Sequence, residues 1–150
     1  MGIAKTNKGL CRVYFPEEAP FDKALKRDFP DFLFVKDDTS CTDIKKQIEE
    51  YFSGKRTSFE LELDLQCPPF YKKALKEVNK IPFGKTVSYR DIAERAGNSK
   101  AVRATGSANA NNPLPIVIPC HRILNTGGGL GGYGGNLERK VYLLELEGSI

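Results

Sequence analysis

Apolar residues recur every three to four positions in two stretches of the N-terminal half, which is the period of an amphipathic helix. The first stretch, residues 21–29, lies between two prolines. The second stretch, residues 44–52, has Thr42 as its expected N-cap and Gly54 just past its end. The pattern therefore predicts two short helices in this half of the chain.

Three other stretches of the N-terminal half predict β-strands. Residues 59–65 alternate apolar and acidic side chains without interruption, which is typical of a half-buried strand. Residues 10–15 form a short run of β-forming side chains, and residues 32–35, Phe-Leu-Phe-Val, predict a buried strand. We therefore expect an α/β domain over residues 1–66, in which no catalytic group of residues stands out.

The composition changes after Cys67-Pro68-Pro69, where we expect a domain boundary and the start of a second domain, residues 67–150. A proline at the start of a helix is favourable, because it has no N–H group to leave unpaired there. The helix expected after these prolines has an apolar stripe made of Phe70, Ala74, Val78 and Ile81.

A helix-turn-helix pattern follows this helix. Ser88 and Asp91 have the spacing of a capping box, which opens a short helix that Gly97 closes. Ser99 is the expected cap of a second helix over residues 100–110. Two short helices joined by a tight turn are found in DNA-binding proteins and also in ordinary packed domains.

The second helix of this pattern consists almost entirely of small side chains, and Arg103 is its one long residue. Small side chains let a helix backbone approach another surface closely. That surface is either the interior of the protein or a nucleic-acid groove, and a narrow minor groove would favour small residues most.

Composition limits the functions that this chain can carry. It has 150 residues, a net charge of +4, four cysteines, one histidine and no tryptophan. This describes an ordinary folded chain of one domain or two small lobes. A single histidine excludes a two-cysteine, two-histidine zinc site, and the cysteines lack the paired short spacing of a structural zinc.

Two further exclusions concern location and partners. No secretory signal and no apolar run of about 20 residues is visible. We therefore expect a protein of the reducing cytosol with no membrane partner. The mild basic excess permits nucleic-acid binding.

Residues 116–123, Ile-Val-Ile-Pro-Cys-His-Arg-Ile, are the strongest candidate for chemistry. They deliver Cys120 and the only histidine, His121, at the end of an expected strand. A cysteine attacks as its thiolate, and because the free thiol has a pKa near ~8.5 it needs a base nearby. A buried cysteine that serves only as a small apolar residue is the competing interpretation.

The strand geometry constrains how the two side chains cooperate. Adjacent strand residues point to opposite faces, so His121 reaches Cys120 only through a distortion at the preceding proline or through one water molecule. A third group must orient the imidazole. The acids that can return from the last expected helix are Glu145 and Glu147.

Pro119-Cys120-His121-Arg122 resembles the active-site motif of the O6-alkylguanine-DNA alkyltransferases, the methylated-DNA–protein-cysteine methyltransferases. The similarity runs in order through residues 70–148, about half of the chain, and includes the segments 81–85, 87–89, 101–104, 112–115 and 131–135. The resemblance implies an α+β fold. A small ribonuclease-H-like α/β domain would precede a mainly helical, winged-helix-like DNA-binding domain that contains the helix-turn-helix.

The resemblance also implies a reaction. The family flips an O6-alkylated guanine out of duplex DNA, because the target atom is inaccessible inside the stack. It then moves the alkyl group to a cysteine that is not regenerated, so that each molecule acts once. Cys120 matches this acceptor, and O4-alkylthymine is a further expected substrate. His121 matches the histidine that takes the thiol proton through a water, and Glu147 matches the acid that orients it. Tyr89 matches the tyrosine that assists flipping and protonates the departing guanine.

Residues for DNA and base binding follow from the same resemblance. Arg103 matches the finger that fills the gap left by the flipped base. The other residues expected at the DNA are Lys100, Ala101, Thr105, Gly106, Ser107 and Asn109. The residues expected in the base pocket are Asn112, Pro115, Ile123, Tyr133 and Gly134.

Some of these assignments are more specific. The carbonyls of Cys120 and Ile123 would accept hydrogen bonds from the guanine amino group. Arg122 would have a structural role near the domain boundary. Asn109 departs from relatives that have a bulkier apolar residue there, a difference that affects intercalation.

We therefore expect a monomeric, cytoplasmic DNA-repair methyltransferase that acts on double-stranded DNA containing O6-alkylguanine. No cofactor is expected, and no metal, because the zinc ligands of some relatives are missing. Three alternatives remain: a lesion sensor of the alkyltransferase-like type, a helix-turn-helix module with a structural cysteine, and a cysteine hydrolase. The sensors usually replace the cysteine by tryptophan, whereas this chain has Cys120 and no tryptophan. A hydrolase would turn over.

Overall fold

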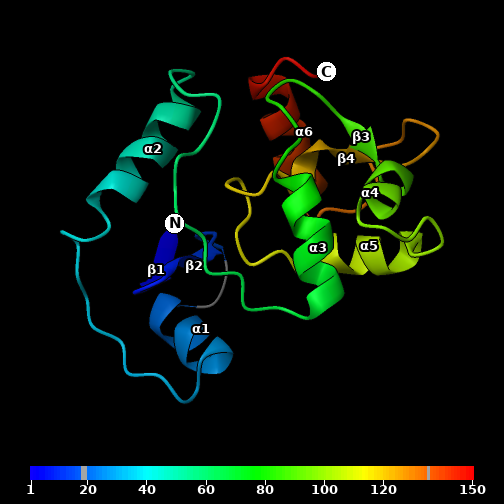
Figure 1. The fold of residues 1–150 in the computed structure, drawn as a ribbon. Helices are drawn as coiled ribbons and strands as arrows, with labels where there is room; N and C mark the ends of the chain where they lie inside the picture. Colours follow the sequence, from blue (N-terminus) through cyan, green and yellow to red (C-terminus); the bar gives the residue numbers. More distant parts are fainter. Residues whose placement is uncertain (18–19, 135) are drawn as a thin grey trace.

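The computed structural model describes residues 1–17, 20–134 and 136–150. Figure 1 shows two groups of elements joined by an extended segment. The N-terminal group contains β1 (Gly2–Thr6), β2 (Gly9–Tyr14), α1 (Phe21–Asp28) and α2 (Thr42–Phe52). The C-terminal group contains α3 (Pro69–Val78), β3 (Val87–Ser88), α4 (Tyr89–Arg95), α5 (Val102–Ala110), a 3₁₀ turn (Cys120–Arg122), β4 (Ile123–Leu124) and α6 (Leu137–Leu146). The α+β prediction is confirmed.

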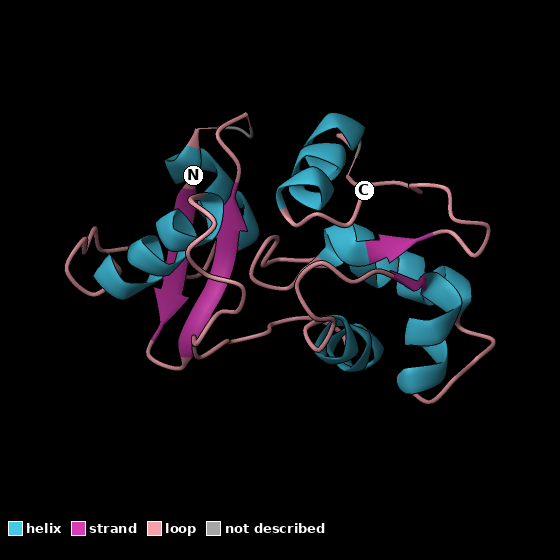
Figure 2. Cartoon of the chain, turned by 90° about the horizontal axis from the view of Figure 1, so that it is seen from above, coloured by secondary structure: helices cyan, strands magenta, loops and turns pink. Residues whose placement is uncertain are grey.

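The long strands β1 and β2 form an antiparallel hairpin, shown on one side of Figure 2. The turn between them needs a glycine at position 9. Gly9 has a φ of 141°, and a Cβ atom there would lie 2.4 Å from the carbonyl oxygen of Glu62. The segment before the domain linker therefore passes directly over the hairpin turn.

The prediction of a strand over residues 59–65 is wrong, although the alternation of buried and exposed side chains that it was based on is present. Glu60 and Glu62 are exposed, whereas the apolar residues between and beside them are partly or fully buried. The segment pairs with the hairpin only at a parallel bridge between Leu10 and Leu63. Alternate burial on a packed surface therefore needs no continuous ladder.

The buried strand expected over residues 32–35 is also wrong. These residues are exposed, and Leu33 is 99% accessible. Phe32 and Phe34 instead pack edge-on against Phe29, with ring centroids 5.9 and 6.2 Å away. A run of β-forming residues makes a strand only where a partner strand is in reach, and none pairs with it in the described part of the chain.

The helices of the N-terminal group form where the spacing predicts them. The N-cap of α2 is Cys41 rather than Thr42, which is the first helical residue. None of the helices within the described ranges has the length and apolar character needed to cross a bilayer.

The helix-turn-helix pattern is present as α4 and α5, which pack against each other and against α3. The capping box of α4 is confirmed: Ser88 Oγ accepts from the Asp91 N–H at 3.1 Å, and Asp91 Oδ2 accepts from the Ser88 N–H at 2.8 Å. The expected cap at Ser99 is wrong. The N-cap of α5 is Ala101, and it is the side chain of Asn98 that accepts from the backbone before the helix.

One core extends through both groups. Leu10 and Val13 of the hairpin belong to the same buried cluster as Leu75 and Ile118. The N–H of Val13 also donates to the carbonyl of Pro113 at 2.9 Å. The domain boundary expected at residue 67 stays a prediction.

Candidate active site

Cys120 lies in a 3₁₀ turn and not at the end of a strand. Pro119 precedes the turn with φ −78° and ψ 63°, and Ile123 follows it in extended conformation. The N–H of Arg122 closes the turn on the carbonyl of Pro119 at 2.9 Å. Successive side chains in a 3₁₀ helix are about 120° apart. The strand geometry expected from the sequence would point Cys120 and His121 in opposite directions. In the 3₁₀ turn their side chains do not point in opposite directions.

Strand β4 ties this turn to the helix-turn-helix. Ile123 and Leu124 pair in parallel with Val87 and Ser88 of β3. Ser88 is the N-cap of α4, so the residue after it, Tyr89, is held close to the turn. Gly131 lies beside Tyr89 with a φ of 67°, a left-handed conformation that favours glycine, and a Cβ atom there would lie 3.0 Å from Asn125 Oδ1 and 3.3 Å from the Tyr89 ring.

The only histidine is paired with a carboxylate in the protein interior. His121 Nε2 lies 2.8 Å from Glu147 Oε1, and neither side chain has an exposed atom. Burial by itself would raise the pKa of Glu147, but hydrogen bonds from His121 and Arg122 outweigh it and hold the pKa at about 2. Of the two acids that the sequence proposed, the structure places Glu147 at the histidine and leaves Glu145 exposed.

The ionised carboxylate decides which nitrogen of His121 carries the proton. A carboxylate can only accept, so Nε2 must donate, and Nδ1 keeps its lone pair. Nδ1 is buried, and no side chain or backbone group of the described residues bonds to it. Burial lowers the pKa of His121, with Glu147 opposing this shift. The imidazole therefore presents a neutral proton acceptor at physiological pH.

Arg122 holds the same carboxylate with two hydrogen bonds. Its Nε donates to Glu147 Oε2 and its Nη2 donates to Glu147 Oε1, both at 2.8 Å. The remaining Nη1 donates to the carbonyl of Ile81 at 2.5 Å. The guanidinium thus connects the turn, the end of α6 and the segment after α3. These contacts agree with the structural role that the resemblance implied for Arg122.

The thiol of Cys120 is buried, with 3% of the residue exposed. Burial raises its pKa, whereas Asn112 and Tyr133 beside the sulfur and the charge of Lys140 oppose the increase. Asn112 is itself fixed, since its Nδ2 donates to the carbonyl of Ile118 at 2.9 Å. The resting thiol therefore needs a proton acceptor before it can react.

Two residues at this site were missed by the sequence reasoning. Lys140 is fully buried, and its Nζ donates to the carbonyls of Ile123, at 2.6 Å, and Leu130. Burial lowers its pKa to about 8. Its spacing from Leu143, Leu144 and Glu147 would have placed it on the inner face of the last helix. Tyr51 of α2 reaches Glu147 from the N-terminal group, and no local signal indicates this contact.

The residues expected at the DNA fall into two groups. Arg103 and Lys100 are exposed, and a Cβ atom at Gly106 would meet no atom within 4 Å. Ala101 and Ser107 are partly accessible. Thr105 and Asn109 are buried, with 1% and 7% of each residue exposed. The accessible members lie on α5 or in the two residues before it, and we call this set the α5 face: Lys100, Ala101, Arg103, Gly106 and Ser107.

Asn109 contacts the active-site turn instead. Its Nδ2 donates to the carbonyl of Cys120 at 3.2 Å. The carbonyls of Cys120 and Ile123 are both expected to bind guanine. The carbonyl of Ile123 accepts from Lys140, whereas the carbonyl of Cys120 accepts twice, from Asn109 and from the N–H of Ile123 within the turn. A carbonyl oxygen has two lone pairs, so a guanine amino group at Cys120 would have to displace or share one of these donors.

The expected pocket residues differ in how far they are exposed. Tyr133 is 8% exposed and its ring stands edge-on to His121, with centroids 6.5 Å apart. Pro115 and Ile123 are buried and Gly134 is exposed. Gly135, the last residue of the glycine-rich motif, lies outside the described residues.

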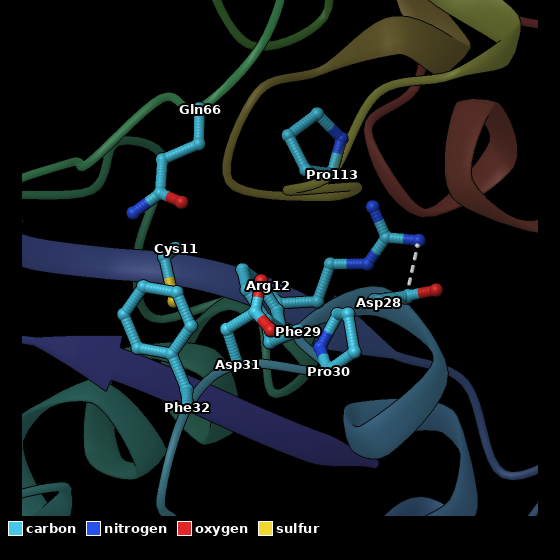
Figure 3. A pocket seen from close by; sticks show the side chains of 9 residues that line it. All are labelled: Cys11, Arg12, Asp28, Phe29, Pro30, Asp31, Phe32, Gln66 and Pro113. Atoms are coloured by element: carbon cyan, nitrogen blue, oxygen red, sulfur yellow. Dashed lines mark ion pairs between the residues drawn. The ribbon is translucent and has the colours of Figure 1, made fainter.

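A separate hollow of about 280 Å³ lies between the N-terminal group and Pro113, and Cys120, His121 and Glu147 do not line it (Figure 3). Figure 3 shows Arg12 and Asp28 in it as an ion pair, at 3.0 Å, with Cys11 nearby. Within the described ranges, no group of three or more His, Cys, Asp or Glu side chains is placed to hold a metal ion.

Family models match both parts of the chain. Residues 1–65 match the ribonuclease-like domain of 6-O-methylguanine DNA methyltransferase, and residues 69–149 match its DNA-binding domain. A methylated-DNA–protein-cysteine methyltransferase of Mycolicibacterium paratuberculosis is 47% identical over 102 residues, which span 68% of this chain and 62% of that protein. The chain thus aligns with less than two thirds of this relative's length.

Longer matches cover nearly the whole chain. The inducible methylated-DNA–protein-cysteine methyltransferase of Bacillus subtilis is 40% identical over 148 residues, covering 97% of this chain and 82% of that protein. The crystal structure of Mycobacterium tuberculosis OGT in complex with DNA superposes with a TM-score of 0.84 at 35% identity. That superposition covers 98% of this chain and 85% of the other.

Proposed function

Because the chain belongs to the 6-O-methylguanine DNA methyltransferase family, we propose that it repairs DNA by moving the alkyl group of O6-alkylguanine onto Cys120. O4-alkylthymine is a second proposed substrate. The observation that carries the proposal is the buried His121–Glu147 pair beside the cysteine, with an unpaired Nδ1. A cysteine that only filled space would not need a buried base with a free lone pair.

The chemistry is one displacement at carbon. The sulfur of Cys120 forms a bond to the alkyl carbon, and the bond between that carbon and guanine O6 breaks. The thiol proton passes through a water to His121 Nδ1, while the hydroxyl of Tyr89 donates a proton to the departing guanine. The relay returns a proton to Tyr89, so the thiol hydrogen ends on guanine. The thioether has no route back to a thiol, and each molecule reacts once.

The substrate is duplex DNA with the damaged base flipped out, since the O6 position is shielded inside the stack. The small side chains of the α5 face allow close approach to a groove, and Arg103 is long enough to fill the gap in the stack. Asn112, Pro115, Ile123, Tyr133 and Gly134 would enclose the flipped base. The buried Thr105 and Asn109 would support this arrangement from behind.

We propose that the protein works as a monomer in the cytosol, without cofactor or metal. All groups of the relay come from one chain. A reactive thiol also requires a reducing compartment.

The deciding experiment is the intact mass of the protein after mixing with duplex DNA that carries O6-methylguanine. We expect a gain of one methyl group, mapped to Cys120 by peptide analysis, and no second turnover. Cys120→Ala is expected to bind the DNA without gaining mass. Methyl transfer by that variant, or release of methanol over many turnovers, would contradict the proposal.

A further inference from the structure

The relay carboxylate receives a hydrogen bond from the N-terminal group. Tyr51 of α2 is fully buried, and its hydroxyl donates to Glu147 Oε1 at 2.6 Å, across 96 positions of sequence. Its ring packs against the rings of Phe52, Phe59 and Phe83, with centroids 5.3 to 6.1 Å away. The hydroxyl therefore has little freedom to leave the carboxylate.

Tyr51 shares its acceptor atom with the catalytic histidine. Glu147 Oε1 also accepts from His121 Nε2 and from Arg122 Nη2, each at 2.8 Å. The negative charge on one oxygen is thus divided among three donors. If one donor is removed, the remaining donors interact more strongly with the charge on this oxygen. Among them, His121 is the residue whose protonation can respond.

The position of the carboxylate does not depend on Tyr51 alone. Arg122 holds both oxygens, and the N–H of Gly84 lies 3.4 Å from Oε2. The other charged group that acts on His121 is Lys140, whose positive charge disfavours the imidazolium together with that of Arg122. Loss of the Tyr51 hydroxyl should therefore change the electrostatics of the relay more than its geometry.

We propose that Tyr51 is a positioning residue of the relay, whose hydroxyl limits how strongly Glu147 attracts a proton to His121. The proposal rests on the proposed alkyl transfer for its consequence. It makes the N-terminal domain part of the reactive centre, because the base strength of His121 then depends on a side chain of α2.

The test is Tyr51→Phe, read by the titration of His121. The chain has one histidine, so its imidazole signals in an NMR spectrum need no further assignment. We expect the midpoint of the His121 titration to rise by about half a pH unit. The acidic limb of the pH profile of the alkyl-transfer rate should move by the same amount. Transfer would then be about threefold slower below the midpoint and unchanged near pH 8.

Tyr14→Phe is the matched control. Tyr14 is also buried in the N-terminal group and donates to a carboxylate, that of Asp28, at 2.8 Å. It should leave the His121 midpoint unchanged. Phe59→Leu is a second control, since it loosens the seat of the Tyr51 ring but keeps the hydroxyl. It should lower the melting temperature without moving the midpoint.

An unchanged midpoint in Tyr51→Phe, or an equal shift in either control, would overturn the proposal. If Tyr51→Phe does not fold, the wild-type spectrum decides. A slowly exchanging hydroxyl proton with a nuclear Overhauser contact to the His121 ring supports the proposal, and its absence overturns it. If the wild-type protein transfers no alkyl group, the proposed function fails, whereas the midpoint still tests the role of Tyr51.

Discussion

Lys140 Nζ donates a hydrogen bond of 2.6 Å to the carbonyl of Ile123, and both residues are completely buried. The same ammonium group donates to the carbonyl of Leu130 in the glycine-rich segment. One charge on α6 thus holds β4 and the loop that follows it, next to the thiol of Cys120. A cation in this position favours the thiolate over the thiol.

Lys140→Met should therefore raise the apparent pKa of Cys120 and slow its alkylation at neutral pH by about tenfold, the effect of one pKa unit. The measurement is the rate of Cys120 modification by iodoacetamide between pH 6 and 10, followed by mass. Lys73→Met, at an exposed position of α3, is the control and should react like the wild type. An unaltered pH profile in Lys140→Met would restrict Lys140 to a structural role.

His121→Gln and Glu147→Gln should each slow single-turnover alkyl transfer, because the first removes the proton acceptor and the second removes the group that orients it. Their combined effect should be smaller than the product of the single effects, since both act on one proton path. Rates for the two single variants and the double variant, over a range of pH, test this. Fully multiplicative losses would show that the two residues act independently.

Glu147→Gln should also change how stability depends on pH. The pKa of Glu147 is lowered from 4.5 to about 2 in the folded state, so its contribution is present above 4.5 and is lost as the pH falls through about 2. The shift corresponds to about 3 kcal/mol at neutral pH. The free energies of unfolding of the wild type and the variant, measured with denaturant, should differ by about this amount at pH 7. This difference in free energy should narrow as the pH falls below 4.5. A constant difference would contradict the linkage.

Arg103→Ala should slow transfer from duplex DNA far more than reaction with free O6-benzylguanine. The free base needs no flipping, so the finger has no gap to fill. Rates on both substrates, for the variant and the wild type, make the comparison. Equal losses would place Arg103 in a step other than flipping.

DNA affinity should fall steeply with salt and depend little on base sequence. The α5 face offers one arginine, one lysine and small side chains, which suits contacts to the phosphates and the groove shape more than to base edges. Binding isotherms on several unmodified duplexes at 50 and 200 mM salt measure both properties. Strong discrimination among those sequences would favour a regulatory DNA-binding module.

The accuracy of the sequence predictions differed from element to element. The capping box at Ser88 and Asp91 formed as predicted, because its partners are three residues apart. The strand expected at residues 32–35 failed, because a strand needs a neighbour that local composition does not specify. Ser99 failed as a cap because Asn98, one position earlier, accepts from the backbone before α5.

The motif around Cys120 and His121 indicated the reacting sulfur and the need for a base, and together with the similar segments through residues 70–148 it indicated the family. Those inferences depend on residue types and on their order along the chain. The protonated nitrogen of His121, the choice of Glu147 over Glu145, and the contributions of Tyr51 and Lys140 were decided only by the tertiary structure. Each depends on a buried contact between residues that are 17 to 96 positions apart. Burial and distance are properties of the packed chain, and they set which of its polar groups remain free to react.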